Sequence, residues 1–315
     1  MKAKVISVVE DAPAETTIHR IWDGREVVRF STEVTDICVI DTDEFGLTIF
    51  MDEQLQSTAA DERIYHESLV APAMALTDFA NKQVLILGGG EGCVAREVLS
   101  WGATHVDQID WDAAFVRWAK DNLQEWNERA YDDGAFHFIH GEAFEVLAGR
   151  RLGKTYDVVI VDLYDPVSDT ISHFTEILGH AMDHLSPGGV MSVYCGLRHT
   201  STLQAADDII PELLKKNGHV VPYRVHIPSF GGEALFLLVA KGPLAATYFP
   251  LNVSKLMSHN PTFMDACNWG RATAWGADAP VSWRGAAKVL TRGFGPEDAA
   301  AVDRAALEAA LVDGK

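Results

Sequence analysis

Hydrophobic and polar residues alternate in short runs through the first 60 residues of the chain. Two of these runs flank Asp23-Gly24, and two more flank residues 43–46, which read DEFG. Such pairs of β-prone runs around a turn sequence predict two β-hairpins. We therefore expect residues 1–60 to form a small antiparallel β-domain built from hairpins.

The pattern changes at Asp61, where apolar residues take helical spacing in DERIYHESLVAPAMAL. Beyond it, apolar runs alternate with amphipathic stretches, which is typical of a mainly parallel sheet with helices on both faces. Strands are expected at 83–87, 105–110, 136–140, 157–162, 190–194, 220–225 and 234–239, and helices from 94, 113 and 203 and over 174–185. We expect this α/β domain to span 61–245, with its ligand sites at the carboxyl ends of the strands.

The remaining residues, 246–315, are rich in Trp and Gly and are only weakly patterned over most of their length. Near their end, GPEDAAAVDRAALEAALV predicts a helix with Pro296 in its first turn. We expect a C-terminal extension that ends in this helix.

The composition is ordinary for a globular protein of 315 residues, with 48% hydrophobic and 23% charged residues. The formal net charge of −19 is not ordinary. It repels the phosphates of nucleic acids and anionic lipids, so neither is expected as a partner, whereas small cations are attracted. No run is apolar enough to span a bilayer, and the four cysteines lack CxxC spacing. We therefore expect a cytoplasmic protein with reduced thiols.

A glycine-rich loop follows the first strand of the α/β domain, in LILGGGEGCVAREVL. A dinucleotide-binding loop has the spacing GxGxxG, but Gly88, Gly90 and Gly92 are spaced GxGxG. Cys93 stands in place of the third glycine. This spacing favours an adenosine-type ligand without a pyrophosphate, although a glycine-rich turn also serves simple packing. Asp110 ends the next strand, where a carboxylate accepts hydrogen bonds from both hydroxyls of a ribose.

Three carboxylates near this loop indicate which kind of ligand it selects. The run YDVVIVD leads directly into Asp162 and Asp165, whose side chains would face the same crevice as Glu91. A turn explains Asp165-Pro166, but it does not explain why Asp162 ends the strand. S-adenosylmethionine is an adenosine-type ligand whose tail carries a carboxylate. That carboxylate would meet like charge in this pocket, at a cost on the order of a few kcal/mol at about 4 Å. The pocket therefore favours a donor whose tail ends in an amine.

Other features are interpreted as structural. His180 and His184 have the i,i+4 spacing of some metal ligands, but no third ligand accompanies them, so no metal site is predicted. Trp111, Trp118 and Trp126 are expected to pack or to border an adenine. The negative charge of the chain argues against their stacking on a nucleic acid.

The chain resembles the polyamine aminopropyltransferases, the spermidine synthase family, and within it the thermospermine synthase branch. The resemblance rests on MDEQLQSTAADERIYHESLVAPAM, LILGGGEGCVAREVL, DWDAAFV, DLYDP, LSPGGVMSVYCG and VHIPSFGG. It implies a Rossmann-like domain of the class I methyltransferase type behind an N-terminal β-domain, and a homodimer. It also implies that decarboxylated S-adenosylmethionine is the co-substrate. Its aminopropyl group would pass to a polyamine such as putrescine or spermidine, leaving methylthioadenosine, with no cofactor and no metal.

The resemblance also implies the residues of the site. Asp110 would bind the ribose, Glu142 and Ala143 would lie near the adenine, and Asp162 would accept the proton of the attacking amine. With the loop glycines, the implied donor site comprises Gln56, His66, Gly88, Gly90, Glu91, Asp110, Glu142 and Ala143. The implied acceptor site comprises Tyr65, Asp162, Asp165 and Phe230.

Some positions depart from the family pattern. Thr35 stands where a donor-contacting Gln is usual, and Glu53 stands where a Gly is usual. Phe230 replaces a Tyr, as in the thermospermine branch, and so leaves the identity of the acceptor open. Two other functions also remain open: an S-adenosylmethionine-dependent N-methyltransferase on the same fold, and a catalytically silent protein that binds adenosine or a polyamine.

Overall fold

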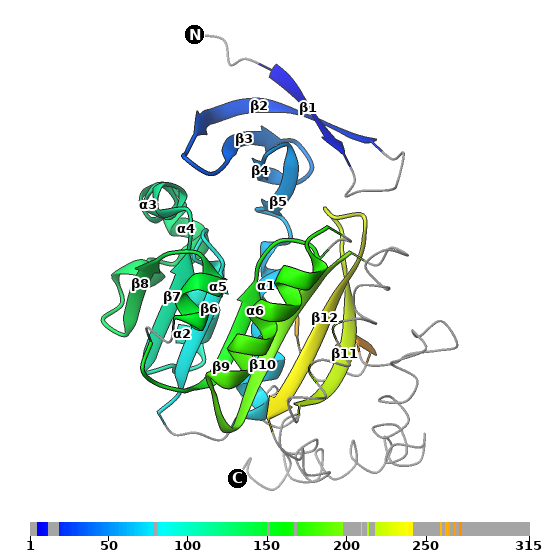
Figure 1. The fold of residues 1–315 in the computed structure, drawn as a ribbon. Helices are drawn as coiled ribbons and strands as arrows, with labels where there is room; N and C mark the ends of the chain where they lie inside the picture. Colours follow the sequence, from blue (N-terminus) through cyan, green and yellow to red (C-terminus); the bar gives the residue numbers. More distant parts are fainter. Residues whose placement is uncertain are drawn as a thin grey trace, which may run out of the picture.

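The structure is a computed structural model. It describes residues 5–11, 19–77, 81–149, 152–166, 169–197 and 218–241, together with positions 209, 213, 259, 262–264, 268, 271 and 272. These residues form an antiparallel sheet and a larger, mostly parallel sheet (Figure 1). The expected helices from 203 and near the C-terminus lie outside the described residues. No helix within the described ranges is long and apolar enough to cross a bilayer.

The N-terminal sheet has five strands in the order β1-β2-β3-β4-β5, each antiparallel to its neighbours. The strands are β1 (Val5–Asp11), β2 (His19–Ser31), β3 (Asp36–Thr42), β4 (Gly46–Met51) and β5 (Gln54–Thr58). The antiparallel sheet and the hairpin around residues 43–46 are therefore confirmed. One face of this sheet packs on α3 (Ala113–Asn122) through Ile37, Val39 and Phe115.

The hairpin predicted at Asp23-Gly24 is wrong, because β2 runs straight through this pair. Gly24 lies opposite Ile6 of β1, inside the ladder. A Cβ at Gly24 would lie 2.9 Å from the backbone oxygen of Asp41. The glycine therefore permits a close approach to β3, and it does not mark a turn.

The turn between β4 and β5 was not predicted. It is formed by Asp52 and Glu53, whose φ angles of 48° and 64° suit a two-residue hairpin turn. Glycine adopts these angles without steric cost. Glu53 stands where the family pattern has a Gly, so no glycine marks this turn in the sequence.

The larger sheet has seven strands in the order β11-β12-β10-β9-β6-β7-β8. Strands β10, β9, β6, β7 and β8 run parallel, whereas β11 and β12 form an antiparallel hairpin beside β10. The strands are β6 (Gln83–Gly88), β7 (His105–Asp110), β8 (Phe136–His140), β9 (Tyr156–Asp162), β10 (Leu185–Leu197), β11 (Gly218–Ile227) and β12 (Gly232–Lys241). The predicted α/β fold with a mainly parallel sheet is confirmed.

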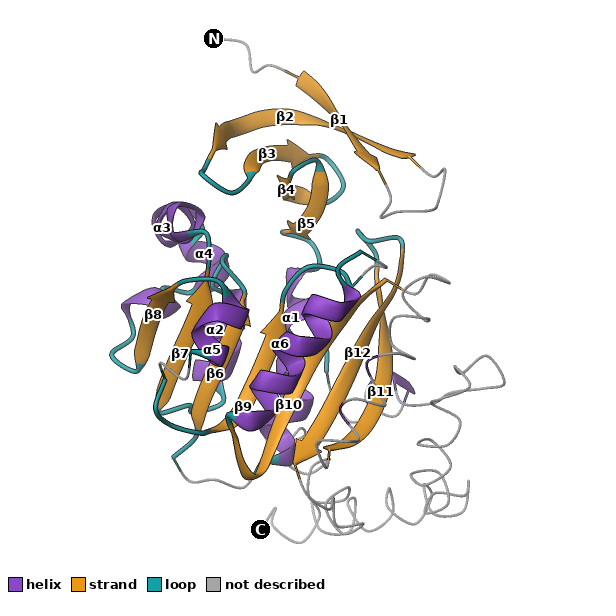
Figure 2. Cartoon of the chain, in the orientation of Figure 1, coloured by secondary structure: helices purple, strands orange, loops and turns teal. Residues whose placement is uncertain are grey.

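Helices cover both faces of this sheet (Figure 2). On one face lie α1 (Glu62–Leu76) and α2 (Cys93–Ser100); on the other lie α5 (Ala143–Ala148) and α6 (Ile171–Asp183). The short α4 (Gln124–Asn127) and a 3-10 helix, Ala130–Asp132, follow α3. The expected helix over 174–185 begins earlier, and α5 was not predicted.

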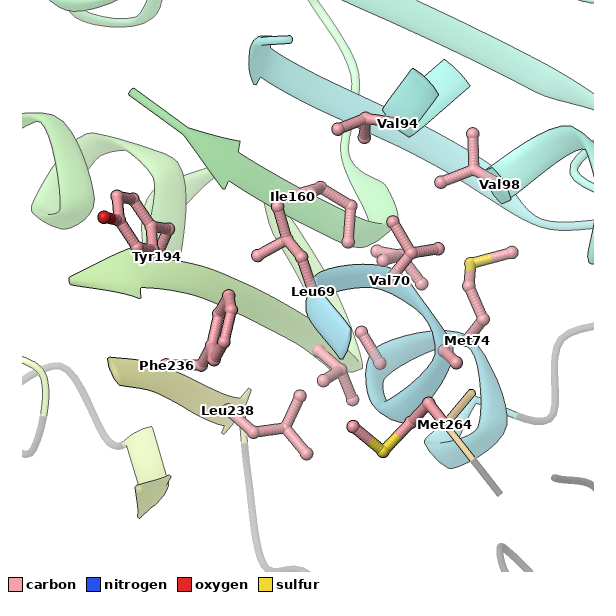
Figure 3. Packing of buried hydrophobic residues seen from close by; sticks show 14 of the residues in the cluster. Leu69, Val70, Met74, Val94, Val98, Ile160, Tyr194, Phe236, Leu238 and Met264 are labelled. Carbon is pink, nitrogen blue, oxygen red and sulfur yellow. The ribbon is translucent and has the colours of Figure 1, made fainter. Parts of the chain in front are cut away.

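The core between α1 and the sheet fixes the start of α1 relative to the strand ends. Leu69, Val70 and Met74 of α1 pack with Ile160 of β9 and Phe236 of β12 (Figure 3). Strand β9 is buried on both faces over most of its length, which explains its unbroken apolar run. The N-terminal sheet lies beyond the carboxyl ends of the parallel strands (Figure 1).

Candidate active site

The carboxyl ends of β6 and β9 bring the glycine loop and Asp162 together. Gly88 pairs directly with Asp162 in the parallel ladder. A Cβ at Gly88 would lie 1.9 Å from the backbone oxygen of Asp162, and the φ of Gly88 is +81°. Only glycine fits this position, and its absence of a side chain lets the loop begin against the strand that carries the carboxylate.

Buried side chains hold the glycine loop in one shape. Gln108 of β7 donates from Nε2 to the backbone oxygens of Gly88 and Gly89, both at 2.9 Å. The Tyr131 hydroxyl donates to the backbone oxygen of Gly90 at 2.7 Å. Sequence reasoning missed both side chains. The one signal for Gln108 is an amide in the middle of a strand of the parallel sheet, where a buried polar group needs a partner.

Asp110 lies beside the loop, at the end of β7. Its Oδ1 accepts a hydrogen bond from the backbone N–H of Asp112 at 2.8 Å. Its Oδ2 would lie 3.1 Å from a Cβ at Gly90, so the carboxylate faces the loop. Burial raises the pKa of Asp110 to about 6. Asp112 in turn caps α3 by accepting from the backbone N–H of Phe115 at 2.9 Å.

A buried histidine lies among carboxylates at the same place. One ligand-type atom from each of His66, Glu91 and Asp162 lies within 4.8 Å of the other two. His66 Nε2 is 3.3 Å from Glu91 Oε1, and His66 Nδ1 is 3.1 Å from Glu62 Oε2. Burial alone would lower the pKa of His66, but Glu62 and Glu91 raise it to about 10. The ring is therefore a cation at neutral pH, and it lowers the pKa of Glu91 despite the burial of that carboxyl.

An arginine anchors this arrangement from α2. Arg96 donates to both carboxylate oxygens of Glu62, each at 2.9 Å, and to Glu97 at 2.8 Å. Burial alone would raise the pKa of Glu62, but hydrogen bonds from His66 and Arg96 lower it to about 2. Sequence reasoning missed Glu62 and Arg96. The available signal was an arginine on the apolar face of a short helix, which needs a buried anion.

Asp162 is itself held by a tyrosine. The Tyr65 hydroxyl donates to Asp162 Oδ1 at 2.5 Å. Burial and the negative charge of Glu91 raise the pKa of Asp162 to about 7. The Tyr65 ring lies 5.3 Å from the ring of Tyr194 and 5.8 Å from that of Phe230.

Asp165 lies on the same side, next to Tyr194. Burial and the Asp165 carboxylate raise the pKa of Tyr194 well above its usual value. The structure therefore brings Tyr65, Asp162, Asp165 and Phe230 together around two tyrosine rings.

Of the remaining predicted residues, Glu142 and Ala143 follow Gly141, whose backbone N–H donates to the backbone oxygen of Asp110 at 3.1 Å. Glu142 caps α5 by accepting from the backbone N–H of Glu145 at 2.9 Å, and Ala143 is buried in the first turn of that helix. Gln56 is exposed on β5, and its amide donates to the backbone oxygen of Gln54. Within the described ranges, no contact joins Gln56 to the other predicted donor residues.

The tryptophans differ in exposure. Trp126 is buried, and the Trp118 ring lies 5.4 Å from that of Phe30, so both pack in the core between the N-terminal sheet and α3. Trp111 is 55% exposed, directly after Asp110 in the chain. Its ring is therefore accessible to a ligand that binds beside Asp110.

Two histidines elsewhere are engaged by protein atoms. His184 places its two ring nitrogens 3.3 Å from the backbone oxygens of Lys154 and Leu147. His105 and Asp107, at the opposite end of the parallel strands, lie 3.0 Å apart, and Lys154 Nζ is 2.6 Å from Asp107. An ammonium group therefore already neutralises the Asp107 carboxylate.

Comparisons with known proteins identify the family. The family model described as "Spermine/spermidine synthase domain" matches residues 62–248. A polyamine aminopropyltransferase of a Synechococcus species is 30% identical over 250 residues, covering 75% of this chain and 80% of that protein. A polyamine aminopropyltransferase of Pyrobaculum calidifontis is 35% identical over 209 residues, covering 64% of this chain and 71% of that protein.

Solved structures share the fold. The spermidine synthase from Thermotoga maritima superposes with a TM-score of 0.75 at 18% identity, covering 86% of this chain and 91% of that one. A spermidine synthase in complex with the transition-state analogue AdoDATO gives a TM-score of 0.76 at 20% identity, covering 86% and 92%. At these identities the likeness concerns the fold, and the sequence matches carry the assignment. The chain belongs to the spermine/spermidine synthase family.

Proposed function

We propose that the protein transfers the aminopropyl group of decarboxylated S-adenosylmethionine to an amine of a polyamine, putrescine or spermidine, and releases methylthioadenosine. One observation carries the proposal for a member of this family. Asp162, hydrogen-bonded by Tyr65 and with its pKa raised to about 7, pairs with the first glycine of an adenosine-type loop. A base and a nucleoside site therefore meet at one edge of the sheet.

In this proposal the donor lies along the glycine loop. Asp110 binds the ribose hydroxyls beside Gly90, and Glu142 and Ala143 lie near the adenine. Thr35 would bind a polar group of the donor from the N-terminal sheet. Its buried hydroxyl oxygen has no hydrogen-bond partner among the described residues, which supports this role. Gln56, which is exposed on β5, completes the donor site by turning toward the ligand.

The tail of the donor lies near Glu91 and His66. The carboxylates of Glu91 and Asp162 favour an amine there and disfavour the carboxylate of S-adenosylmethionine. His66 moderates this selection, because its positive charge already neutralises part of the charge of Glu91.

The reaction is a direct displacement. The acceptor amine, whose reference pKa is near ~10, loses a proton to Asp162 and so exposes its lone pair. The nitrogen then bonds to the methylene carbon next to the sulfonium, and the carbon–sulfur bond breaks. Its electron pair passes to the sulfur, which leaves as the neutral thioether of methylthioadenosine. Alignment of the two substrates supplies much of the rate.

We place the acceptor against Tyr65, Asp165 and Phe230. A phenylalanine at position 230 lacks the hydroxyl of a tyrosine, which supports the thermospermine branch and leaves both spermidine and putrescine open as acceptors. The buried thiols of Cys38, Cys93 and Cys195 support a reducing, cytoplasmic setting. We retain 1–60, 61–245 and 246–315 as the proposed domains.

The proposed assembly is a homodimer formed through the N-terminal sheet. Val5, Val9 and Ile21 share the outer face of β1 and β2 and are 74%, 47% and 70% exposed. Val9 and Ile21 are direct cross-strand partners. An apolar face of this kind, next to the edge strand β1, is typical of a contact with another protein chain.

The test is incubation of the protein with each donor and a panel of amines, followed by mass spectrometry. With the decarboxylated donor, we expect the amine to gain one aminopropyl group and methylthioadenosine to appear, and chromatography then separates isomeric products. A methyl gain from S-adenosylmethionine would establish the methyltransferase alternative. Donor binding without any turnover would establish the silent binding protein.

A further inference from the structure

The loop that carries Phe230 is held from the N-terminal sheet. The loop spans residues 228–231 between β11 and β12, and its Phe230 ring lies 5.8 Å from the ring of Tyr65. Phe230 packs against the core under α1 and also against the core of the N-terminal sheet. Its ring therefore occupies the junction of the two sheets.

Arg20 of β2 binds the backbone of this loop. Its Nη1 donates to the backbone oxygen of Ser229 at 3.0 Å, and its Nη2 donates to that of Phe230. The guanidinium lies close against Gly231, where a Cβ would come within 3.1 Å of Nη2. Glu10 of β1 lies 3.8 Å from Arg20 and pairs with its charge.

A second anchor lies at the start of α1. Asp61 accepts hydrogen bonds from the Ser229 backbone N–H at 2.7 Å and from the Ser229 hydroxyl at 2.9 Å. The backbone oxygen of Asp61 also accepts from the backbone N–H of Tyr65 at 3.3 Å. The loop is therefore tied to the helix that carries Tyr65 on one side and to the N-terminal sheet on the other.

We propose that Arg20 is a positioning residue for the acceptor, because it fixes the loop that presents Phe230 to Tyr65 and Asp162. This inference rests on the proposed function, in which Phe230 lines the acceptor site. Bonds from a guanidinium to carbonyl oxygens are charge-assisted, so their loss loosens the loop more than the loss of neutral bonds would. Among the described residues, no contact joins Arg20 to the predicted donor residues. Its loss should therefore weaken acceptor binding selectively.

The kinetic test compares Arg20→Met with Arg25→Met. Arg25 lies on the same strand, but its side chain is 55% exposed and pairs with Asp41 at the surface. We expect Arg20→Met to raise the KM of the amine by about tenfold, the effect of one charge-assisted hydrogen bond. The kcat and the affinity for methylthioadenosine should stay unchanged. Arg20→Lys, which keeps one charged donor, should give an intermediate KM.

An unchanged KM for the amine in Arg20→Met would overturn the proposal, as would an equal loss of methylthioadenosine affinity. Arg25→Met should behave as the wild-type protein in both measurements. If it raised the KM of the amine as much as Arg20→Met, the effect would belong to the N-terminal sheet in general, and the role of Arg20 would be refuted.

Amide hydrogen exchange tests the loop without any reaction. In Arg20→Met, the amides of Ser229 and Gly231 should exchange faster than in the wild type and in Arg25→Met. Unchanged exchange would overturn the role of Arg20 in holding the loop. Absence of turnover in the wild type would instead refute the proposed function, and the exchange result would still decide whether Arg20 holds the loop.

Discussion

Asp162 has neighbours that shift its pKa in opposite directions. Burial and Glu91 raise the pKa, whereas the His66 charge and the Tyr65 hydrogen bond lower it, and the result is about 7. Asp162 accepts a proton only when ionised, which requires a pH above its pKa. We therefore expect kcat/KM for the amine to fall about tenfold per pH unit as the pH drops below that value.

Two substitutions should move the acidic limb of this pH profile, the region in which kcat/KM falls, in opposite directions along the pH scale. Tyr65→Phe removes a hydrogen bond that lowers the pKa of Asp162, so the limb should shift to higher pH. Glu91→Gln removes a negative charge that raises the pKa, so the limb should shift to lower pH. The profiles of kcat/KM against pH check both shifts, and a limb that stays in place in both variants would mean that another group titrates.

The loss of the base should abolish turnover and spare donor binding. Asp162→Asn should lower kcat by about 10²- to 10⁴-fold, the usual contribution of a general base. Methylthioadenosine affinity should change little, because the nucleoside is held at Asp110 and the glycine loop. Asp157→Asn is the matched control on the same strand, since Asp157 lies at its opposite end and binds the backbone N–H of Gln83. Near-normal kcat in Asp162→Asn would make Asp162 a structural residue.

Donor selection should depend on Glu91. The wild type should bind the decarboxylated donor more tightly than S-adenosylmethionine, whose carboxylate meets like charge. Glu91→Gln should weaken binding of the decarboxylated donor by roughly tenfold, because a charge-assisted hydrogen bond contributes ~1.5 to 3 kcal/mol. The difference in affinity between the two donors should therefore become smaller. Calorimetry with both donors at fixed salt measures the ratio. An unchanged ratio would show that Glu91 does not contact the donor's tail.

At the scale of elements, one buried ion pair joins the start of α1 to α2. Arg96→Met would remove the bidentate partner of the buried Glu62 and leave only His66 to balance its charge, so we expect the free energy of unfolding to fall by about 3 to 5 kcal/mol. Arg25→Met is the control, because Arg25 pairs with Asp41 at the surface, away from this ion pair, and its loss should cost about 0 to 1 kcal/mol. Urea unfolding of both variants checks this, and equal losses would refute it.

The same pair of elements sets a pH window for stability. The pKa of Glu62 is lowered from 4.5 to about 2. Its contribution to the free energy of unfolding is therefore complete above pH 4.5 and is lost as the pH falls through about 2. His66 has its pKa raised from 6.5 to about 10, so its contribution is complete below 6.5 and is lost as the pH rises through about 10. Both contributions are therefore complete between 4.5 and 6.5.

The strands that the sequence predicted well are those with an unbroken apolar run. The β6 and β9 runs are apolar because both strands are buried on both faces. Such a run is recognised in the sequence without knowing which elements pack against it. The hairpin prediction at Asp23-Gly24 failed because this pair is typical of a turn. The glycine is instead required by the close approach of the Asp41 backbone. A local pattern cannot distinguish a glycine that turns from a glycine that admits a neighbouring strand.

The site was predictable where it follows from topology. Glu91 and Asp162 both follow parallel strands, so their meeting could be expected from the order of elements. The position of a charged His66 between carboxylates could not be expected from the order of elements, because it depends on how α1 packs against the sheet. Arg20 was equally hidden, since it meets a loop more than 200 positions away in the chain.

At the scale of the whole molecule, the outer face of β1 and β2 should govern assembly. The wild type should be a dimer, and Val5→Lys with Ile21→Lys should give a monomer, because charged side chains would replace the two most exposed apolar ones on this face. Val34→Lys is the control, as Val34 is 41% exposed and lies between β2 and β3. Light scattering after gel filtration reports the mass. A monomeric wild type, or a double variant that remains dimeric, would refute this interface.

The pairing of Gly88 with Asp162 also bears on how the protein fails when heated. Strands β6 and β9 lie at the middle of the larger sheet, where backbone bonds are usually the last to open. The relative position of base and nucleoside loop is thus set by the same ladder that holds the domain together. Heat inactivation should therefore coincide with cooperative melting of the sheet, without an earlier stage in which a folded protein has lost its catalytic geometry.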